Sequence, residues 1–169
     1  MLLHNAHVEP RLVASDSSPL IGLATAGAFE LLRQLFGTLK ITRIVKDEVT
    51  ARGDLPGAAE LTAAMREGWI RVAPAPPETW QFPELDAGEA STIALAAKRV
   101  GALVLMDDAL GREHAMALGL EVLDVAGLLL AAKRAGLIDA IEPLVARLTR
   151  RGFTLPEASL RAVLASEAP

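Results

Sequence analysis

Short apolar runs alternate with longer segments of helical periodicity along the chain. The apolar runs predict strands at residues 12–14, 39–42, 69–73, 102–106 and 120–123. The periodic segments, several of which end at a glycine, predict helices at residues 20–24, 28–36, 43–51, 58–67, 87–100, 109–118, 125–136, 140–151 and 156–166. Strands separated by helices in this way are typical of a parallel sheet covered on both faces. The pattern therefore predicts an α/β fold with a central parallel sheet of about five strands.

The stretch from Arg11 to Leu20 puts a carboxylate where an open parallel sheet holds its ligands. The first strand runs directly into Asp16. Ser18 and Pro19 then indicate a helix start, with Ser18 as the N-cap and Pro19 at the first helical position. Ligands of such sheets bind outside the carboxyl ends of the strands. Asp16 is either a ligand-binding carboxylate of this kind or the acceptor of a local turn.

Two glutamates share the apolar faces of predicted helices. Glu48 lies four residues after Ile44 and three after Val45, so we expect it to meet a cation or to lie at the rim of the core. Glu89 follows Asp86 by three residues, which is the spacing of a capping box. It also faces the packed side of its helix. The spacing alone leaves a structural and a functional role open for both glutamates.

Asp107 and Asp108 follow the fourth strand, at the same strand-to-helix position as Asp16. One of them can cap the next helix, and we assign that role to Asp108. Asp16, Asp107 and the two glutamates can then converge at the carboxyl edge of one sheet. Such a cluster needs cations to stay ionised, and all-carboxylate ligation suits Mg²⁺ or Mn²⁺. The chemistry that this predicts is metal-assisted hydrolysis of a phosphodiester.

Composition limits the class of protein. A length of 169 residues predicts one domain over 1–169, with residues 1–10 flexible and helices in 139–169. There is no cysteine, no apolar run long enough to cross a membrane and no basic-then-apolar start, so we expect a cytoplasmic protein without disulfides. A net charge of −4 and the absence of tyrosine argue against a broad basic surface or a base-stacking platform for nucleic acid. Nucleic-acid binding would need a local patch of Arg and Lys.

The order of these motifs resembles the PIN domain family over nearly the whole chain, from about residue 12 to residue 153. The matching motifs are Asp16-Ser-Ser-Pro-Leu-Ile, Glu48, Leu85-Asp-Ala-Gly-Glu89-Ala and Leu105-Met-Asp107-Asp-x-x-Gly-Arg112. They are most similar to a poorly characterised branch of the family. The resemblance implies a three-layer PIN-like fold. It places the family's four catalytic, metal-binding acids on Asp16, Glu48, Glu89 and Asp107. Its small polar residue after the first acid would be Ser17 or Ser18.

Members of this family are typically Mg²⁺- or Mn²⁺-dependent ribonucleases, and many are VapC-like toxins of toxin–antitoxin modules. The resemblance therefore implies an endoribonuclease acting on single-stranded or structured RNA, a homodimer and an antitoxin protein as partner. The alternative is a PIN-like fold kept as a protein-interaction module with a weak site. Two positions differ from the usual pattern: the third acid is more often Asp, and the hydroxyl residue that commonly lies two before the fourth acid is Leu105.

Other side chains give weaker signals. Arg112 follows the acidic turn, where its guanidinium either holds a phosphate or is solvated on the helix. His4 and His7 are three residues apart and are interpreted as an incidental pair. Apolar side chains in excess of one helix face, in 128–130, 140–148 and 156–164, indicate either an interface or closure of the core.

Overall fold

The structure is a computed structural model, and it describes residues 10–166 except 52, 75–78 and 80. His4, His7 and most of the terminus expected to be flexible lie outside the described residues. None of the helices in the described part of the chain has the length and hydrophobicity that a bilayer crossing requires.

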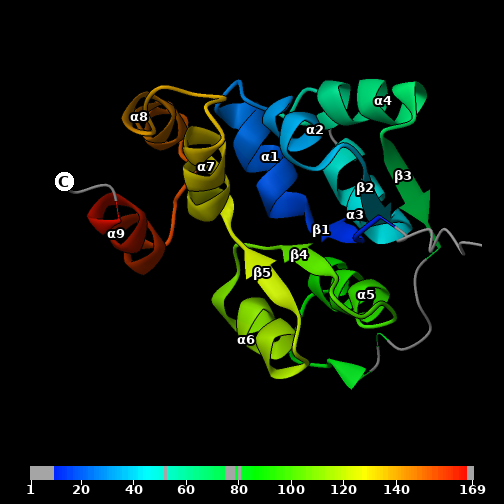
Figure 1. Cartoon of the computed structure of the whole chain (residues 1–169). Helices are drawn as coiled ribbons and strands as arrows, with labels where there is room; N and C mark the ends of the chain where they lie inside the picture. The colour runs from blue at the N-terminus through cyan, green and yellow to red at the C-terminus, as the bar shows by residue number, and fades with distance from the viewer. Residues whose placement is uncertain (1–9, 52, 75–78, 80, 167–169) are drawn as a thin grey trace, which may run out of the picture.

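A parallel sheet of five strands forms the centre of the described chain (Figure 1). The spatial order is β3-β2-β1-β4-β5, and every neighbouring pair is parallel. The strands are β1 Val13–Ser15, β2 Leu39–Thr42, β3 Ile70–Ala73, β4 Leu103–Leu105 and β5 Glu121–Leu123. β1 is therefore the middle strand, with β2 and β4 as its neighbours. The predicted α/β class and the parallel sheet are confirmed.

Nine helices occur in the described residues. They are α1 Ser17–Thr25, α2 Leu31–Phe36, α3 Arg43–Thr50, α4 Ala58–Glu67, α5 Ala87–Ala96, α6 Ala109–Ala117, α7 Val125–Arg134, α8 Glu142–Arg150 and α9 Glu157–Ala165. In Figure 1, α5 and α6 lie on one side of the sheet and α1 to α4 on the other. α7 lies beside α1, and α8 and α9 lie outside it. These helices complete the three layers that the pattern predicted.

Strand alternation gives the sheet two apolar cores. Val13, Leu39 and Ile41 point to the larger core, which α1, α3, α4 and α7 help to close. Ala14 and Val104 point to the smaller one, beneath α5 and α6. Because side chains of a strand alternate between faces, one run of apolar residues serves both cores. This explains why the strands read as nearly continuous apolar segments.

At least three predicted helix boundaries are wrong, and one of them is the start of α2, which lies at Leu31 and not at residue 28. Helix α1 begins at Ser17, and its N-cap is Asp16 in an extended conformation, not Ser18. Pro19 is still acceptable there because the first turn of a helix has no intrahelical partners for its N–H groups. Helix α5 ends at Ala96 and not at residue 100. A turn follows it, and Gly101 takes a positive φ of 74° before β4.

A buried hydroxyl pair joins the sheet to both helices that carry the predicted glutamates. Thr42 caps α3 by accepting a hydrogen bond from the Val45 N–H at 3.2 Å. Its hydroxyl lies 2.7 Å from that of Ser91 in α5, and the Ser91 hydroxyl donates to the Gly88 carbonyl. Thr42 is therefore the donor to Ser91, since each hydroxyl has one proton. This chain fixes α3 and α5 relative to the end of β2.

The replacement Thr42→Val should lower the free energy of unfolding by about 1–3 kcal/mol, because it removes the cap of α3 and a buried hydrogen bond. Urea unfolding measures this change. Thr38→Val is the matched control, because Thr38 is exposed just before the same strand. Equal effects of the two substitutions would show that the hydroxyl pair does not hold α3 and α5 in place.

Candidate active site at the carboxyl edge of the sheet

Asp16 and Asp107 follow the carboxyl ends of neighbouring strands. Ser15 pairs with Leu105 across β1 and β4, and the Asp16 N–H donates to the Leu105 carbonyl at 3.0 Å. Asp16 is only 3% exposed. Its Oδ1 is buried and has no hydrogen-bond partner in the described part of the chain. The side chain makes no N-cap hydrogen bond to α1.

Glu48 reaches Asp16 across the backbone of Gly88. A Cβ atom placed on Gly88 would lie 2.5 Å from Glu48 Oε2 and 3.0 Å from Asp16 Oδ1. Both carboxylates therefore face the same small space above this glycine. Glu48 itself is exposed, so it lies at the rim of the core, which was one of the two predicted positions. The Ser17 hydroxyl and the Gly88 N–H are hydrogen-bond donors to its carboxylate.

Glu89 takes the capping-box role that its spacing predicted. Its N–H donates to Asp86 Oδ1 at 2.8 Å, and its Oε2 accepts from the Asp86 N–H at 3.2 Å. Glu89 is also 9% exposed and lies on the packed side of α5. The two interpretations that the sequence left open are therefore compatible. Asp86, which was expected only to cap the helix, adds its own charge to the group.

Burial is the main cause of raised pKa values in this group of acids. Desolvation raises the pKa of Asp16 to about 7, against a lowering by the Ser17 N–H, and the charges of Asp86, Glu48 and Glu89 raise it further. Desolvation and then the Asp86 charge raise the pKa of Glu89 to about 7. Desolvation is also the largest cause of the raised pKa of Glu48, and the hydrogen bonds from Ser17 and Gly88 oppose this increase. Without a cation, these neighbouring carboxylates resist full ionisation.

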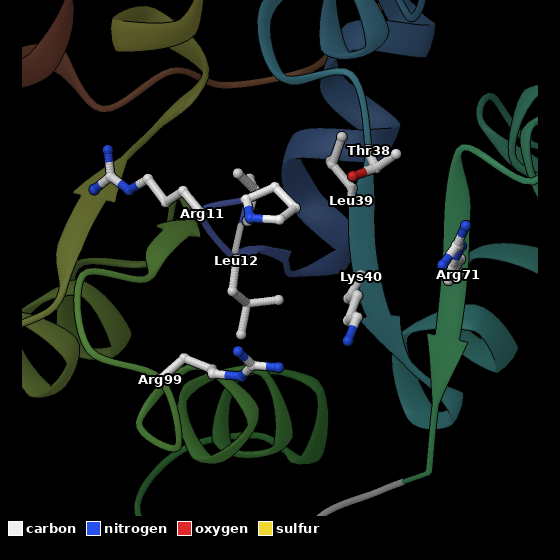
Figure 2. A pocket seen from close by; sticks show the side chains of 9 residues that line it. Arg11, Leu12, Thr38, Leu39, Lys40, Arg71 and Arg99 are labelled. Carbon is white, nitrogen blue, oxygen red and sulfur yellow. The ribbon is translucent and has the colours of Figure 1, made fainter. Parts of the chain in front are cut away.

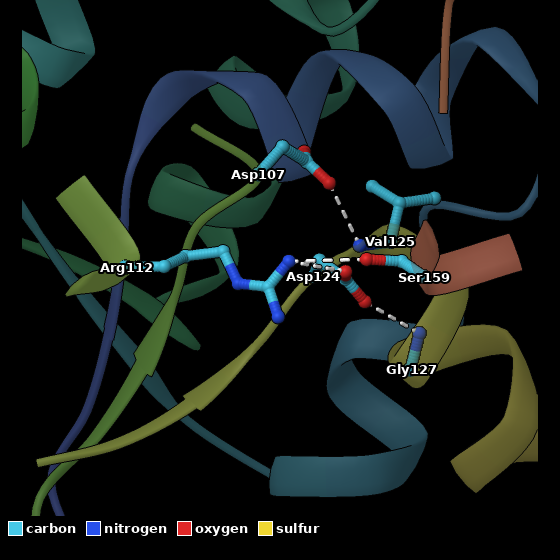
Figure 3. A network of polar contacts seen from close by, with 6 residues as sticks. All are labelled: Asp107, Arg112, Asp124, Val125, Gly127 and Ser159. Atoms are coloured by element: carbon cyan, nitrogen blue, oxygen red, sulfur yellow. Dashed lines mark hydrogen bonds and ion pairs between the residues drawn. The ribbon is translucent and has the colours of Figure 1, made fainter. Parts of the chain in front are cut away.

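One oxygen of Asp107 contacts the start of α7 (Figure 3). Its Oδ1 accepts from the Val125 N–H at 2.9 Å, while its Oδ2 is buried without a hydrogen-bond partner among the described residues. Desolvation raises the pKa of Asp107 to about 6, and the charge of Asp124 contributes to the increase. The structure therefore brings Asp16, Glu48 and Glu89 together and places Asp107 on the neighbouring strand end with a different contact.

Arg112 is half-buried and pairs with a carboxylate of the protein. Its Nη1 donates to Asp124 Oδ2 at 2.8 Å and to the Ser159 hydroxyl of α9 at 3.1 Å, as Figure 3 shows. Asp124 in turn caps α7 by accepting from the Gly127 N–H. The solvated interpretation of Arg112 is wrong, and its positive charge is shared with Asp124. The contact also ties α9 to this edge of the sheet.

Three predicted residues remain, namely Asp108, Ser17 and Ser18. Asp108 caps α6 by accepting from the Gly111 N–H at 2.9 Å, as expected. Ser17 and Ser18 are half-buried in the first turn of α1, with Ser17 next to Glu48. Asp124 was not among the predicted site residues. Its position directly after β5 repeats that of Asp16 after β1, and this repetition was the signal for its place at the edge.

The donor set at this edge fits a divalent cation in part. Within the described ranges, no three carboxylate or imidazole groups lie close enough to complete a metal site. Two observations nevertheless match a cation. Asp16 Oδ1 and Asp107 Oδ2 are buried acceptors without partners at adjacent strand ends. Buried polar atoms are almost always satisfied, and a bound ion is one of the few explanations for an exception.

A family model described as PIN domain matches residues 12–168 of the chain. The chain belongs to the PIN domain family. The match covers nearly the whole chain, including each strand end described above. No curated protein matches this chain. PIN domains are typically nucleases and generally use divalent metal ions, which agrees with a carboxylate edge that has unpaired oxygens.

In this PIN domain, Asp16→Asn should change how stability depends on pH. The pKa of Asp16 in the folded state, about 7, lies above its ordinary value of 3.8, so the folded state binds the proton more tightly. Native stability in EDTA should then fall as the pH rises from 4 to 7 and level off above 7. The neutral Asn should raise stability at pH 8 by on the order of a few kcal/mol, with little effect at pH 4.

Urea unfolding of native protein and variant across this pH range checks the expectation. Asp47→Asn is the control, because Asp47 is an exposed acid on α3. Parallel stability curves for native protein and Asp16→Asn would mean that the Asp16 carboxylate is not desolvated in the folded protein.

Gly88→Ala should separate the folding of this PIN domain from its response to metal. The new methyl group would meet Glu48 Oε2 and Asp16 Oδ1, and the exposed Glu48 side chain is the one free to swing away. Alanine is also the better helix former by about 1 kcal/mol, so stability in EDTA should change little. The rise in melting temperature with millimolar Mn²⁺ should be reduced or lost.

Gly53→Ala is the control, since a Cβ there has open space. An undiminished Mn²⁺ response in Gly88→Ala would show that the space above Gly88 is not part of a metal site.

Proposed function

We propose that this PIN domain is an Mg²⁺- or Mn²⁺-dependent endoribonuclease. The observation that carries the proposal is the pair of buried, unpartnered oxygens of Asp16 and Asp107 at neighbouring strand ends. Strand ends of a parallel sheet are where such folds bind ligands. Membership of a family of nucleases supports phosphodiester hydrolysis as the reaction.

The cation would be held by the free oxygens of Asp16 and Asp107, with Glu48 and Glu89 contributing negative charge at the entrance. Bound there, it would supply activation of a water molecule and stabilisation of charge on the phosphate. Glu48 and Asp16 share the space above Gly88, and the Ser17 hydroxyl and the Gly88 N–H lower the pKa of Glu48, which favours its ionised form. The Val125 N–H fixes one oxygen of Asp107, which leaves the other for the ligand.

The proposal extends to the role in the cell and to partners only through the family resemblance. A toxin of a toxin–antitoxin module, acting in the cytoplasm as a homodimer, is the role that the resemblance favours. The partner would then be an antitoxin protein. Sedimentation of the full chain at tens of micromolar measures the dimer separately from the nuclease activity.

A protein-interaction module with a weak site is the second candidate function. It is favoured by the position of Asp107, which contacts the start of α7, and by the fully buried Leu105 at the position where a hydroxyl residue is common. The acidic net charge of −4 also favours it, because it disfavours general RNA binding. Absence of RNA cleavage, together with an Mn²⁺-independent melting temperature, would favour this function.

The adjacent aspartates give the sharpest test of the ribonuclease. Asp107→Asn should reduce metal-dependent cleavage of single-stranded RNA by more than about 100-fold, since outer-shell changes alone cost about 10–100-fold. Its fold should persist, because an amide oxygen can still accept from the Val125 N–H. Asp108→Asn should keep most of the activity, because Asn caps a helix as well as Asp.

Cleavage assays with Mg²⁺ or Mn²⁺, with circular dichroism of each variant, measure both effects. An equal loss in the two variants would contradict the assignment of Asp107 as the ligand. Cleavage by the native protein that survives EDTA would contradict the metal-dependent mechanism.

A further inference from the structure

A basic pocket opens at the amino edge of the sheet, opposite the carboxylates. Its volume is about 370 Å³, and it lies where β1 and β2 begin and where the chain leaves α5 (Figure 2). The polar side chains that line it are Arg11, Thr38, Lys40, Arg71 and Arg99. No acidic residue is among the described residues that line it. In a chain with a net charge of −4, such a collection of cations is a local exception.

Lys40 and Arg71 are the centre of this basic pocket. They are register partners on the parallel strands β2 and β3, so their like charges lie side by side on the same face of the sheet. Like charges in such cross-strand positions destabilise a sheet by up to about 1 kcal/mol. Both side chains are exposed, and no ion pair to either is found among the described residues. A bound anion would remove their repulsion.

Of the other lining groups, Arg11 and Arg99 each have an interaction within the protein. Arg11 turns toward β5, where it forms an ion pair with Glu121 at 2.7 Å. Figure 2 shows Arg99 and Lys40 directed into the same space below Leu12. The Thr38 hydroxyl lies at the rim and can donate or accept. The pocket therefore offers guanidinium, ammonium and hydroxyl groups from three different segments.

We propose that the basic pocket binds phosphate groups of the RNA strand that is cut at the opposite edge of the sheet. The proposal rests on the proposed ribonuclease function. Two adjacent cations in a small cavity fit a compact group that carries more than one charge, and planar guanidinium groups match phosphate oxygens in pairs. The pocket is also the local patch of Arg and Lys that RNA binding by an acidic protein requires.

Helix α5 connects the basic pocket to the carboxylates. Glu89 lies in its first turn, and Arg99 lies just beyond its end. A helix of 10 residues is about 15 Å long, so an RNA strand must extend over several nucleotides to reach both. A dinucleotide at the carboxylates cannot reach the basic pocket. Substrate length therefore separates binding at this pocket from the chemistry.

The test compares Lys40→Gln/Arg71→Gln with Arg134→Gln/Arg150→Gln in the full chain. The control removes two exposed cations from the last turns of α7 and α8, so the net charge of both variants is the same. Affinity for a labelled single-stranded RNA 12-mer is measured in EDTA over a range of salt. The first variant should bind roughly 10- to 100-fold more weakly at 50 mM salt, with a salt slope smaller by about 1.4. The control should bind like the native protein, and all three should cleave a dinucleotide equally.

Equal RNA affinity of the two variants would overturn the proposal. If the native protein binds no RNA, the proposed function fails, and pyrophosphate in EDTA then tests the basic pocket by itself. A rise in melting temperature that is lost only in Lys40→Gln/Arg71→Gln would show that the pocket takes a small phosphate ligand. No rise would overturn the phosphate assignment. Polyglutamate and pyrophosphate that displace the RNA with equal potency would also overturn the phosphate assignment. The pocket would then be a site for an acidic peptide.

Discussion

The burial of carboxylates without a matching positive charge is the constraint on which this structure depends. Asp16 lies almost entirely inside the protein, and the charges nearest to it are those of Asp86, Glu48 and Glu89. An isolated buried charge is costly enough that the group either takes up a proton or pairs with a cation. The fold maintains this arrangement through the Thr42–Ser91 hydroxyl pair and the capping box of α5. The buried carboxylates therefore lower the free energy of unfolding of the protein, and they lie at the edge where the chemistry is proposed to occur.

The two strand-end aspartates show how the protein treats similar residues differently. One oxygen of Asp107 is satisfied by the start of α7, and Arg112 neutralises the nearby Asp124. Among the described residues, no basic side chain acts on Asp16 in this way. The carboxyl edge of the sheet thus has two halves. The half around Gly88 is acidic, and the half around Asp107 and Asp124 has partly balanced charges. The two halves meet between β1 and β4. A cation at that junction would take the oxygens that both halves leave unpaired.

Much of the fold could be predicted because each element depends on local sequence. The bounds of β2 and α4 and the caps by Thr42 and Asp108 follow from apolar runs, glycines and N-cap residues. The direction of the Asp107 side chain could not be predicted, because it depends on where the Val125 N–H lies in three dimensions. The ion pair of Arg112 with Asp124 could not be predicted either, because α6 and the start of α7 must pack together before the two residues meet. The family's motifs indicated which acids gather at the edge but not which of them share a space.

The central claim is that Asp16 and Asp107 jointly hold a divalent cation. The most direct measurement is anomalous diffraction from crystals of the full chain soaked in Mn²⁺. We expect a manganese peak at the carboxyl edge between β1 and β4, in contact with one oxygen of each aspartate. A peak elsewhere, or an empty edge with Asp16 protonated and Asp107 still bound only to the Val125 N–H, would contradict the account.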